Sequence, residues 1–419
     1  MRKKGLLQPL RKKINGNPFI KNLGWLGVAQ GGIRVTRLAA TVILPRFLTP
    51  DDYGLAALVL TTYEFTQTLT KIGINAKVIQ ASDEEIEEVS NSAYWLNWLV
   101  FCSLFVAQCL VAFPVAWFFN HDELILPICI IGGTFLISPI GRIQAGLLQR
   151  ESCFKTIAAA QVLRYGTANI LTAIFAVMGM GLWAIVLPIV LASPLEFIVY
   201  LVKHPWRVQY FTTKQWNNIF RFGVNILGSS MLKTFRQNMD YLLVGRILGV
   251  TELGKYYFAF NAGLGISITI INSITTALYP LLCKFKGNFN RLKQEYRKNL
   301  KIIAIVIIPF VLLQVSLAPF YVPIIFGEKW IPAIPILILI CLSAIPRPFN
   351  NAAFALLAAV DKPQIFLVWN FIFTIIFAIS LLIGVQWNIL GVASAVLASH
   401  AIFIPIFVHW STRYVFSGR

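Results

Sequence analysis

A chain of 419 residues is long enough for two or three soluble domains, but 57% of its residues are hydrophobic and only 13% are charged. This composition excludes a water-soluble surface and indicates an integral membrane protein with many crossings. The 36 lysine and arginine residues against 17 aspartate and glutamate residues are explained by basic loops and anionic membrane lipids, and we expect no nucleic acid as a partner.

The N-terminal segment, residues 1–19, is basic and contains a proline. The apolar run behind it is too long and too rich in polar residues for a cleaved signal peptide, so we expect the segment to be retained. The chain then alternates between polar connections and apolar runs of about 20 residues or more, the length that crosses a hydrocarbon core about 30 Å thick. The predicted spans are 20–45, 53–72, 92–119, 124–147, 157–179, 181–202, 217–246, 253–281, 300–326, 330–356, 363–385 and 388–411.

The connections between these spans differ in charge. Outward connections would hold only Arg46, Arg246, Lys255 and Lys329, whereas the other connections hold most of the lysine and arginine. Positive charge is retained on the cytoplasmic side of a membrane. Both termini are therefore expected in the cytoplasm.

A short polar elbow occurs twice, because residues 46–54 and 246–254 share an arginine, a leucine, an acid and a glycine in register. Any short loop between helices can carry these residue types. Each elbow, however, follows the first span of one half, and six spans in each half make both halves enter the membrane from the same side. We therefore predict a parallel internal repeat, with an N-lobe at 20–202, a cytoplasmic linker at 203–216, a C-lobe at 217–411 and a cytoplasmic tail at 412–419.

Several charged residues fall inside the predicted spans or at their edges. The basic ones are Arg34, Arg37, Lys71, Arg142, Arg164, Lys233, Arg236 and Arg347. Only Glu64, Glu196 and Asp240 oppose them. Each charge in lipid would cost about 2.5–3.5 kcal/mol, so most of these side chains must face a hydrated interior.

The spacing of these residues forms polar stripes on single helix faces. In the first span the stripe is Gln30, Arg34, Arg37 and Thr41. In the second span it is Glu64, Gln67, Thr68 and Lys71. In the seventh span it is Lys233, Arg236, Gln237 and Asp240, where Arg236 and Asp240 are spaced to form an ion pair.

A cationic interior suits an anionic group such as a phosphate or diphosphate, because guanidinium groups bind these in a bidentate manner. The predicted substrate-binding cavity consists of Arg34, Arg37, Lys71, Arg142, Arg164, Lys233 and Arg236. Arg142, Lys233 and Arg347 have the alternative of reaching lipid headgroups from span ends. Glu64 and Asp240 are either structural counter-ions or coupling groups, and Glu196 is expected at the membrane interface.

Motifs for other kinds of chemistry are missing from the sequence. It has no P-loop, no HExxH and no serine-centred elbow, and its four histidines are scattered. The six cysteines have no metal-binding spacing. We therefore predict a transporter rather than an enzyme, with no cofactor and no metal.

Four segments, in order along the chain, resemble landmarks of the polysaccharide transport family. This family comprises flippases within the multidrug/oligosaccharidyl-lipid/polysaccharide exporter superfamily. The segments are Leu44–Gly54, Leu147–Glu151 with Phe154, Gly181–Val186 and Gly327–Trp330. Many members of the family have fourteen spans, whereas this chain has about twelve.

The resemblance implies an all-α, two-lobed, V-shaped bundle in the bacterial plasma membrane that works by alternating access. Its substrate would be a polyprenyl-diphosphate-linked oligosaccharide, moved from the inner to the outer leaflet for O-antigen, exopolysaccharide or capsule biosynthesis. Expected partners are this substrate, membrane lipids, a polysaccharide polymerase and glycosyltransferases.

Two other functions remain as alternatives. A cation-coupled drug or metabolite antiporter of the same superfamily would need an acidic interior, and the interior charges are mostly basic. A membrane glycosyltransferase or polymerase would need a large outer loop with catalytic residues, and the outward connections predicted here are short.

Overall fold

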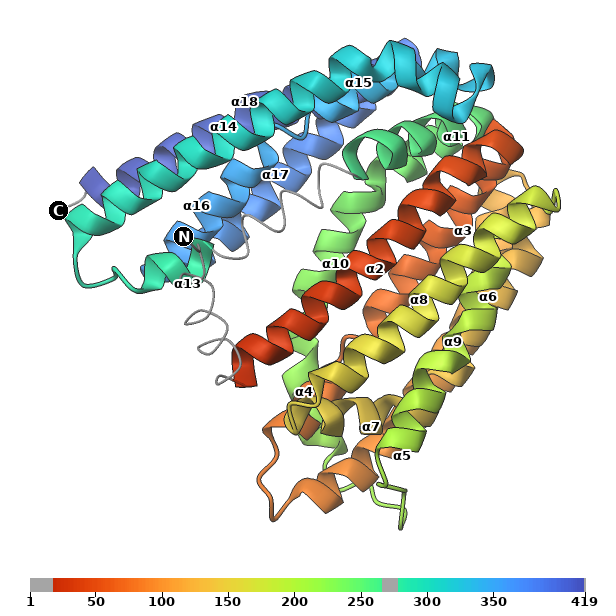
Figure 1. Ribbon diagram of the computed structural model, residues 1–419, viewed down its shortest axis with the longest axis vertical. Helices are drawn as coiled ribbons and strands as arrows, with labels where there is room; N and C mark the ends of the chain where they lie inside the picture. The colour runs from red at the N-terminus through yellow and green to blue at the C-terminus, as the bar shows by residue number, and fades with distance from the viewer. Residues whose placement is uncertain (1–17, 266–277, 418–419) are drawn as a thin grey trace, which may run out of the picture. The chain divides into compact units, whose positions relative to one another are not determined.

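The computed structural model describes residues 18–265 and 278–417, and every regular element in this range is helical (Figure 1). Most of the predicted basic N-terminal segment lies outside the described residues. So do residues 266–277 of the predicted eighth span and the last two residues of the predicted tail.

Five helical stretches in the described part of the chain are long and apolar enough to cross a membrane, or six if one bent pair counts as a single crossing. The stretches are Ile86–Phe119, Trp183–Lys203, Phe289–Phe326, Glu328–Ala359 and Pro363–Phe416, and the bent pair is Asp122–Ile137 with Pro139–Arg150. The chain is thus an all-α membrane protein, as its composition predicts.

The helices form two compact units, and two of the helices run from one unit into the other. The first unit contains Met1–Leu48 and Val59–Thr234, and the second contains Thr49–Leu58 and Phe235–Arg419. The start of α3 (Pro50–Leu69) and the end of α10 (Trp216–Ile247) therefore pack in the second unit. The rest of each helix packs in the first unit. This division differs from the predicted linker at 203–216, and the predicted lobe boundaries stay a prediction.

In the first unit, α8 packs against both α2 and α9, and α6 packs against α5 and α9 (Figure 1). Short helices α4 and α7 pack together, and α7 also contacts α5 and α9. The elements are α2 (Pro18–Phe47), α3 (Pro50–Leu69), α4 (Ile74–Gln80), α5 (Ile86–Phe119), η1 (Asp122–Leu124), α6 (Ile125–Ile137), α7 (Pro139–Arg150), α8 (Phe154–Val177), α9 (Trp183–Lys203) and α10 (Trp216–Ile247).

One predicted span, 124–147, is not a single straight helix. It is broken between α6 and α7, which meet at an angle of 51°. Pro139 begins α7 and has no N–H to continue the hydrogen bonds of α6, and the hydroxyl of Ser138 bonds back to the carbonyl of Thr134 at 2.8 Å. The break directs α7 toward α4, where Val78 and Ile143 join a buried apolar cluster.

In the second unit, α18 packs against α15, α16 and α17, and α14 packs against α15 (Figure 1). Gly384 and Gly391 bring the end of α17 and the start of α18 close together, because a Cβ on either residue would overlap the carbonyl of the other. The elements are α11 (Val250–Ala259), η2 (Phe260–Leu264), α13 (Leu278–Cys283), α14 (Phe289–Tyr321), η3 (Val322–Phe326), η4 (Glu328–Ala333), α15 (Ile334–Leu342), α16 (Arg347–Ala359), α17 (Pro363–Gly384), η5 (Val385–Trp387) and α18 (Asn388–Ser417).

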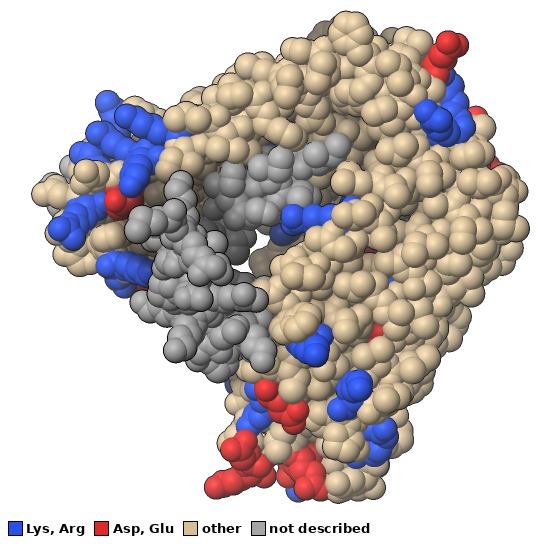
Figure 2. Space-filling view, viewed as in Figure 1, with Lys and Arg blue, Asp and Glu red and all other residues tan. Residues whose placement is uncertain are grey.

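Basic side chains gather at the end of the second unit that holds α13 and the beginning of α14 (Figure 2). They precede the apolar part of α14, as basic residues do where a helix leaves the cytoplasm and enters a bilayer. The exposed ones include Lys284, Lys286, Arg291, Arg297, Lys298 and Lys301.

Both elbows are tight turns between two helices, built from different residues. In the first, the backbone N–H of Thr49 donates to the Asp52 carboxylate at 2.9 Å, and the N–H of Asp52 donates to the Thr49 hydroxyl at 3.2 Å. This reciprocal pair caps α3, whose first residue is Pro50. In the second, Gly249 occupies the equivalent position and takes φ 92°, a conformation that favours glycine.

The two elbows pack directly against each other within the second unit. A Cβ on Gly54 would overlap the carbonyl oxygen of Val250, and a Cβ on Gly254 would overlap the carbonyl oxygen of Pro50. The contact is reciprocal, since each glycine faces the residue that begins the other helix. Only glycine permits two helix starts to approach this closely.

Aromatic rings pack next to this contact between the elbows. Trp330 is fully buried, stacks on Phe258 with ring centroids 4.0 Å apart, and meets the edge of Tyr53 at 5.0 Å. The Thr251 hydroxyl hydrogen-bonds the Asp51 carboxylate above them. Trp330 ends the last of the four landmark segments, so two distant landmarks of the sequence meet at the elbows.

Candidate functional site

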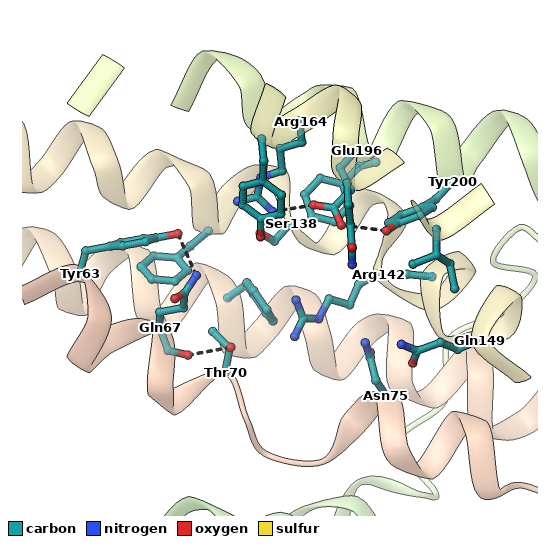
Figure 3. A pocket seen from close by; sticks show the side chains of 17 residues that line it. Tyr63, Gln67, Thr70, Asn75, Ser138, Arg142, Gln149, Arg164, Glu196 and Tyr200 are labelled. Atoms are coloured by element: carbon teal, nitrogen blue, oxygen red, sulfur yellow. Dashed lines mark hydrogen bonds and ion pairs between the residues drawn. The ribbon is translucent and has the colours of Figure 1, made fainter. Parts of the chain in front are cut away.

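A cavity of about 250 Å³ lies inside the first unit (Figure 3). Its walls come from α3, α5, α6, α7, α8 and α9, together with Thr70 and with Asn75 of α4. Phe101, Phe135, Ile157 and Phe197 supply its apolar surface. The polar side chains on α3, α7, α8 and α9 are Tyr63, Gln67, Arg142, Gln149, Gln161, Arg164, Tyr165, Glu196 and Tyr200.

Arg164 and Glu196 form a largely buried ion pair on one side of the cavity. The Arg164 Nη1 atom lies 2.6 Å from Glu196 Oε2, and the two side chains are 17% and 13% exposed. The Tyr200 hydroxyl donates to the other carboxylate oxygen, Oε1, at 2.8 Å. The side chain of Glu196, which is expected from the sequence to lie at the membrane interface, thus points into the interior of the first unit, and its depth in the membrane stays a prediction. Glu196 and Tyr200 are four residues apart on α9, so both point toward α8 and the cavity.

Arg142 reaches the cavity from α7, just after the bend at Pro139, and extends toward its centre (Figure 3). Its guanidinium lies 5.3 Å from the centre of the Phe101 ring. No described residue forms a hydrogen bond or ion pair with it. The N–H donors of Arg142 are therefore not engaged by any described residue, whereas Arg164 is already held by Glu196.

The net charge of this site is positive, because two guanidinium groups face one carboxylate. Polar amides surround them, and the carbonyl oxygen of the Asn75 side chain is buried without a hydrogen-bond partner among the described residues. Such a set can bind a phosphate group through Arg142 and hydroxyl groups through the amides.

Several other predicted site residues lie elsewhere in the first unit. The side chains of Arg34, Arg37, Lys71 and Lys233 are exposed and do not line this cavity, and Glu64 is also exposed. Their assignment to the path of a substrate stays a prediction.

In the second unit the predicted pair between Arg236 and Asp240 is wrong. Arg236 instead donates to the side-chain oxygen of Asn370 on α17 at 2.6 Å and lies over the ring of Phe373. Asp240 accepts from the hydroxyl of Tyr256 at 2.8 Å. The i, i+4 spacing permits an ion pair but does not require one, and tertiary partners offer each group a better bond here.

We predict that Tyr256→Phe lowers stability by about 1–3 kcal/mol, because the buried Asp240 carboxyl loses its hydroxyl donor. The loss should appear as a lower melting temperature of the purified protein in detergent. Tyr279→Phe is the matched control, since Tyr279 is 46% exposed. An equal shift for both variants would contradict the prediction.

The polar stripes predicted from the sequence did not include some of the cavity residues. In the second span the cavity face is Tyr63, Gln67 and Thr70, whereas the predicted face included Thr68, which bonds Thr234 at 2.8 Å in a buried position. The i, i+4, i+7 spacing of Tyr63, Gln67 and Thr70 was a usable signal. Charged residues drew the prediction to the neighbouring face.

A family model described as "Polysaccharide biosynthesis protein" matches residues 43–335, which include both elbows and all residues of the cavity. The Teichuronic acid biosynthesis protein TuaB of Bacillus subtilis is 26% identical, over 93% of this chain and 81% of that protein. The Lipopolysaccharide biosynthesis protein WzxC of Escherichia coli is 26% identical, over 88% of this chain and 75% of that protein.

Among solved structures, the Lipid II flippase MurJ in an inward closed conformation has the same fold. The TM-score is 0.76 at 14% sequence identity, covering 93% of this chain and 87% of that one. The sequence landmarks, the helical membrane architecture and the family match agree with one another, and the chain belongs to the polysaccharide biosynthesis protein family.

Proposed function

We propose that this protein is a flippase that moves a polyprenyl-diphosphate-linked oligosaccharide from the inner to the outer leaflet of the bacterial plasma membrane. Family membership and the functions for which the relatives are named support this assignment. The observation that carries it is the cavity of the first unit, where Arg142 forms no hydrogen bond or ion pair with a described residue and Arg164 lines the same space.

The diphosphate is the part of the substrate that this cavity suits. A volume of about 250 Å³ accommodates a charged headgroup rather than a whole lipid-linked oligosaccharide. Arg142 would bind the diphosphate, and the amides of Gln67, Asn75 and Gln161 would hydrogen-bond the first sugar. The polyprenyl chain would remain in the bilayer.

Transport would proceed by alternating access of two six-helix lobes related by a parallel repeat, with about twelve spans and both termini in the cytoplasm. The reciprocal packing of Gly54 and Gly254 supports the repeat, because equivalent residues of the two elbows make equivalent contacts. The basic end of α14 supports the orientation. A polysaccharide polymerase and glycosyltransferases would act on the product and the precursor, so this protein would transport and not catalyse.

Arg142→Ala should reduce the rate of flipping at least tenfold in proteoliposomes that contain a fluorescent polyprenyl-diphosphate sugar. The variant removes a donor group that no described residue occupies, and each lost charge-assisted hydrogen bond is worth about 1.5–3 kcal/mol. Lys214→Ala is the control, because Lys214 is 75% exposed and lies outside the cavity.

The same assay separates the cavity from the wider cationic stripes. Arg34→Ala and Arg37→Ala test the predicted path on α2. Wild-type flipping by Arg142→Ala, with the protein folded and inserted, would contradict the role of the cavity.

A further inference from the structure

We propose that Glu196 is a built-in competitor for the anionic group of the substrate: in the empty cavity its carboxylate occupies Arg164, and a bound diphosphate must displace it. This inference rests on the proposed function. It assigns to Glu196 the role of setting how tightly the headgroup is held and how readily it leaves.

The two cavity arginines differ in their bonding, although both face the same space. Arg164 on α8 is bonded to Glu196 on α9 at 2.6 Å. Arg142 on α7 forms no hydrogen bond or ion pair with a described residue; its guanidinium lies beside the Phe101 ring and faces Glu196 across the cavity without bonding to it. A diphosphate thus finds one donor group available and one occupied.

Glu196 is held so that it can exchange partners. One carboxylate oxygen accepts from Arg164 and the other accepts from the Tyr200 hydroxyl, which is on the same helix one turn away. If an incoming phosphate oxygen takes the Arg164 donors, the Tyr200 hydroxyl still donates to the carboxylate, which keeps this hydrogen bond although it loses its ion-pair partner. The structure therefore provides a position for Glu196 after displacement.

Such a competitor would help the protein to release the headgroup of its substrate. A headgroup bound by two fully available guanidinium groups would be held tightly, and a transporter must bind its substrate weakly enough to let it go. A carboxylate that returns to Arg164 as the diphosphate leaves lowers the affinity without removing the site. It also prevents two uncompensated positive charges from facing each other in the empty cavity.

The test compares binding and flipping in Glu196→Gln, which keeps the size of the side chain and removes its charge. Binding is measured with farnesyl diphosphate on the purified full-length protein in nanodiscs. We expect affinity to rise about tenfold, a change equivalent to about 1.4 kcal/mol, while the rate of flipping falls severalfold because release becomes slow. Glu151→Gln is the matched control, since Glu151 pairs with His204 outside the cavity.

A second variant shows whether the freed Arg164 causes the gain. In the double variant Glu196→Gln with Arg164→Gln the tenfold gain should be absent, because no second guanidinium is released. A gain that persists in the double variant would mean that the loss of negative charge acts at long range, and it would overturn the competitor role. Unchanged or weaker binding by Glu196→Gln, with a normal melting profile, would overturn it as well.

Binding measurements with three ligands distinguish a failure of this inference from a failure of the proposed function. Inorganic pyrophosphate and phosphatidylglycerol are measured beside farnesyl diphosphate, and the gain should appear for both diphosphates and not for the phospholipid. If neither wild type nor Glu196→Gln binds a diphosphate, the proposed function and the inference both fail. If wild type binds and Arg142→Ala does not, while Glu196→Gln equals wild type, only the inference fails.

Discussion

Replacing Gly254 by alanine should destabilise the protein by about 3 kcal/mol or more, at or above the upper end of the usual cost of overpacking. The added Cβ would overlap the carbonyl oxygen of Pro50. A backbone atom cannot move aside by a change of rotamer, so the starts of α3 and α11 must separate. That separation also disturbs the packing of Tyr53 and Phe258 on the buried Trp330.

Gly54→Ala should have a comparable effect, because its Cβ would overlap the carbonyl oxygen of Val250. Gly133→Ala on α6 is the control, since no atom lies within 4 Å of its Cβ position, and alanine there should be neutral or stabilise the helix by up to about 1 kcal/mol. Melting temperatures in detergent and the yield of folded protein are the measurements. Similar values for the elbow variants and the control would refute the close contact.

The elbows show how far the sequence alone reaches. Their shared residue types predicted two equivalent turns, and the structure has a turn at each place. The sequence did not predict that the turns contact each other, because a glycine that allows a close approach looks the same in a sequence as one that only loosens a loop. The neighbour that requires Gly254 is Pro50, about 200 positions away.

The cavity shows a second limit. The energetic cost of charge in a membrane singled out Arg142, Arg164 and Glu196 from the sequence. Which of the charged residues lie together depends on tertiary structure, since the bend at Pro139 positions α7, and the packing of α8 on α9 joins Arg164 to Glu196. Helical periodicity predicts the residues that share a face, but it does not show what that face contacts.

Arg164→Ala should lower stability by about 3–5 kcal/mol, the typical cost of removing one partner of a buried ion pair. The Glu196 carboxylate is 13% exposed, so it would lose its bonded counter-charge without gaining full access to water. The Tyr200 hydroxyl would remain as its hydrogen-bond donor, and one neutral donor does not replace a guanidinium. The melting temperature of the purified protein should fall accordingly, and Lys214→Ala should leave it nearly unchanged.

The decisive comparison is with the double variant Arg164→Ala, Glu196→Gln, which should recover most of the lost stability. Removing both charges leaves no carboxylate stranded without its ion-pair partner, and buried pairs replaced as a whole are often close to neutral in stability. Recovery would show that the cost of Arg164→Ala comes from the stranded carboxylate, not from a hole left by the long side chain. If the double variant is as unstable as Arg164→Ala, the pair acts mainly through packing, and the electrostatic account of the cavity must be replaced.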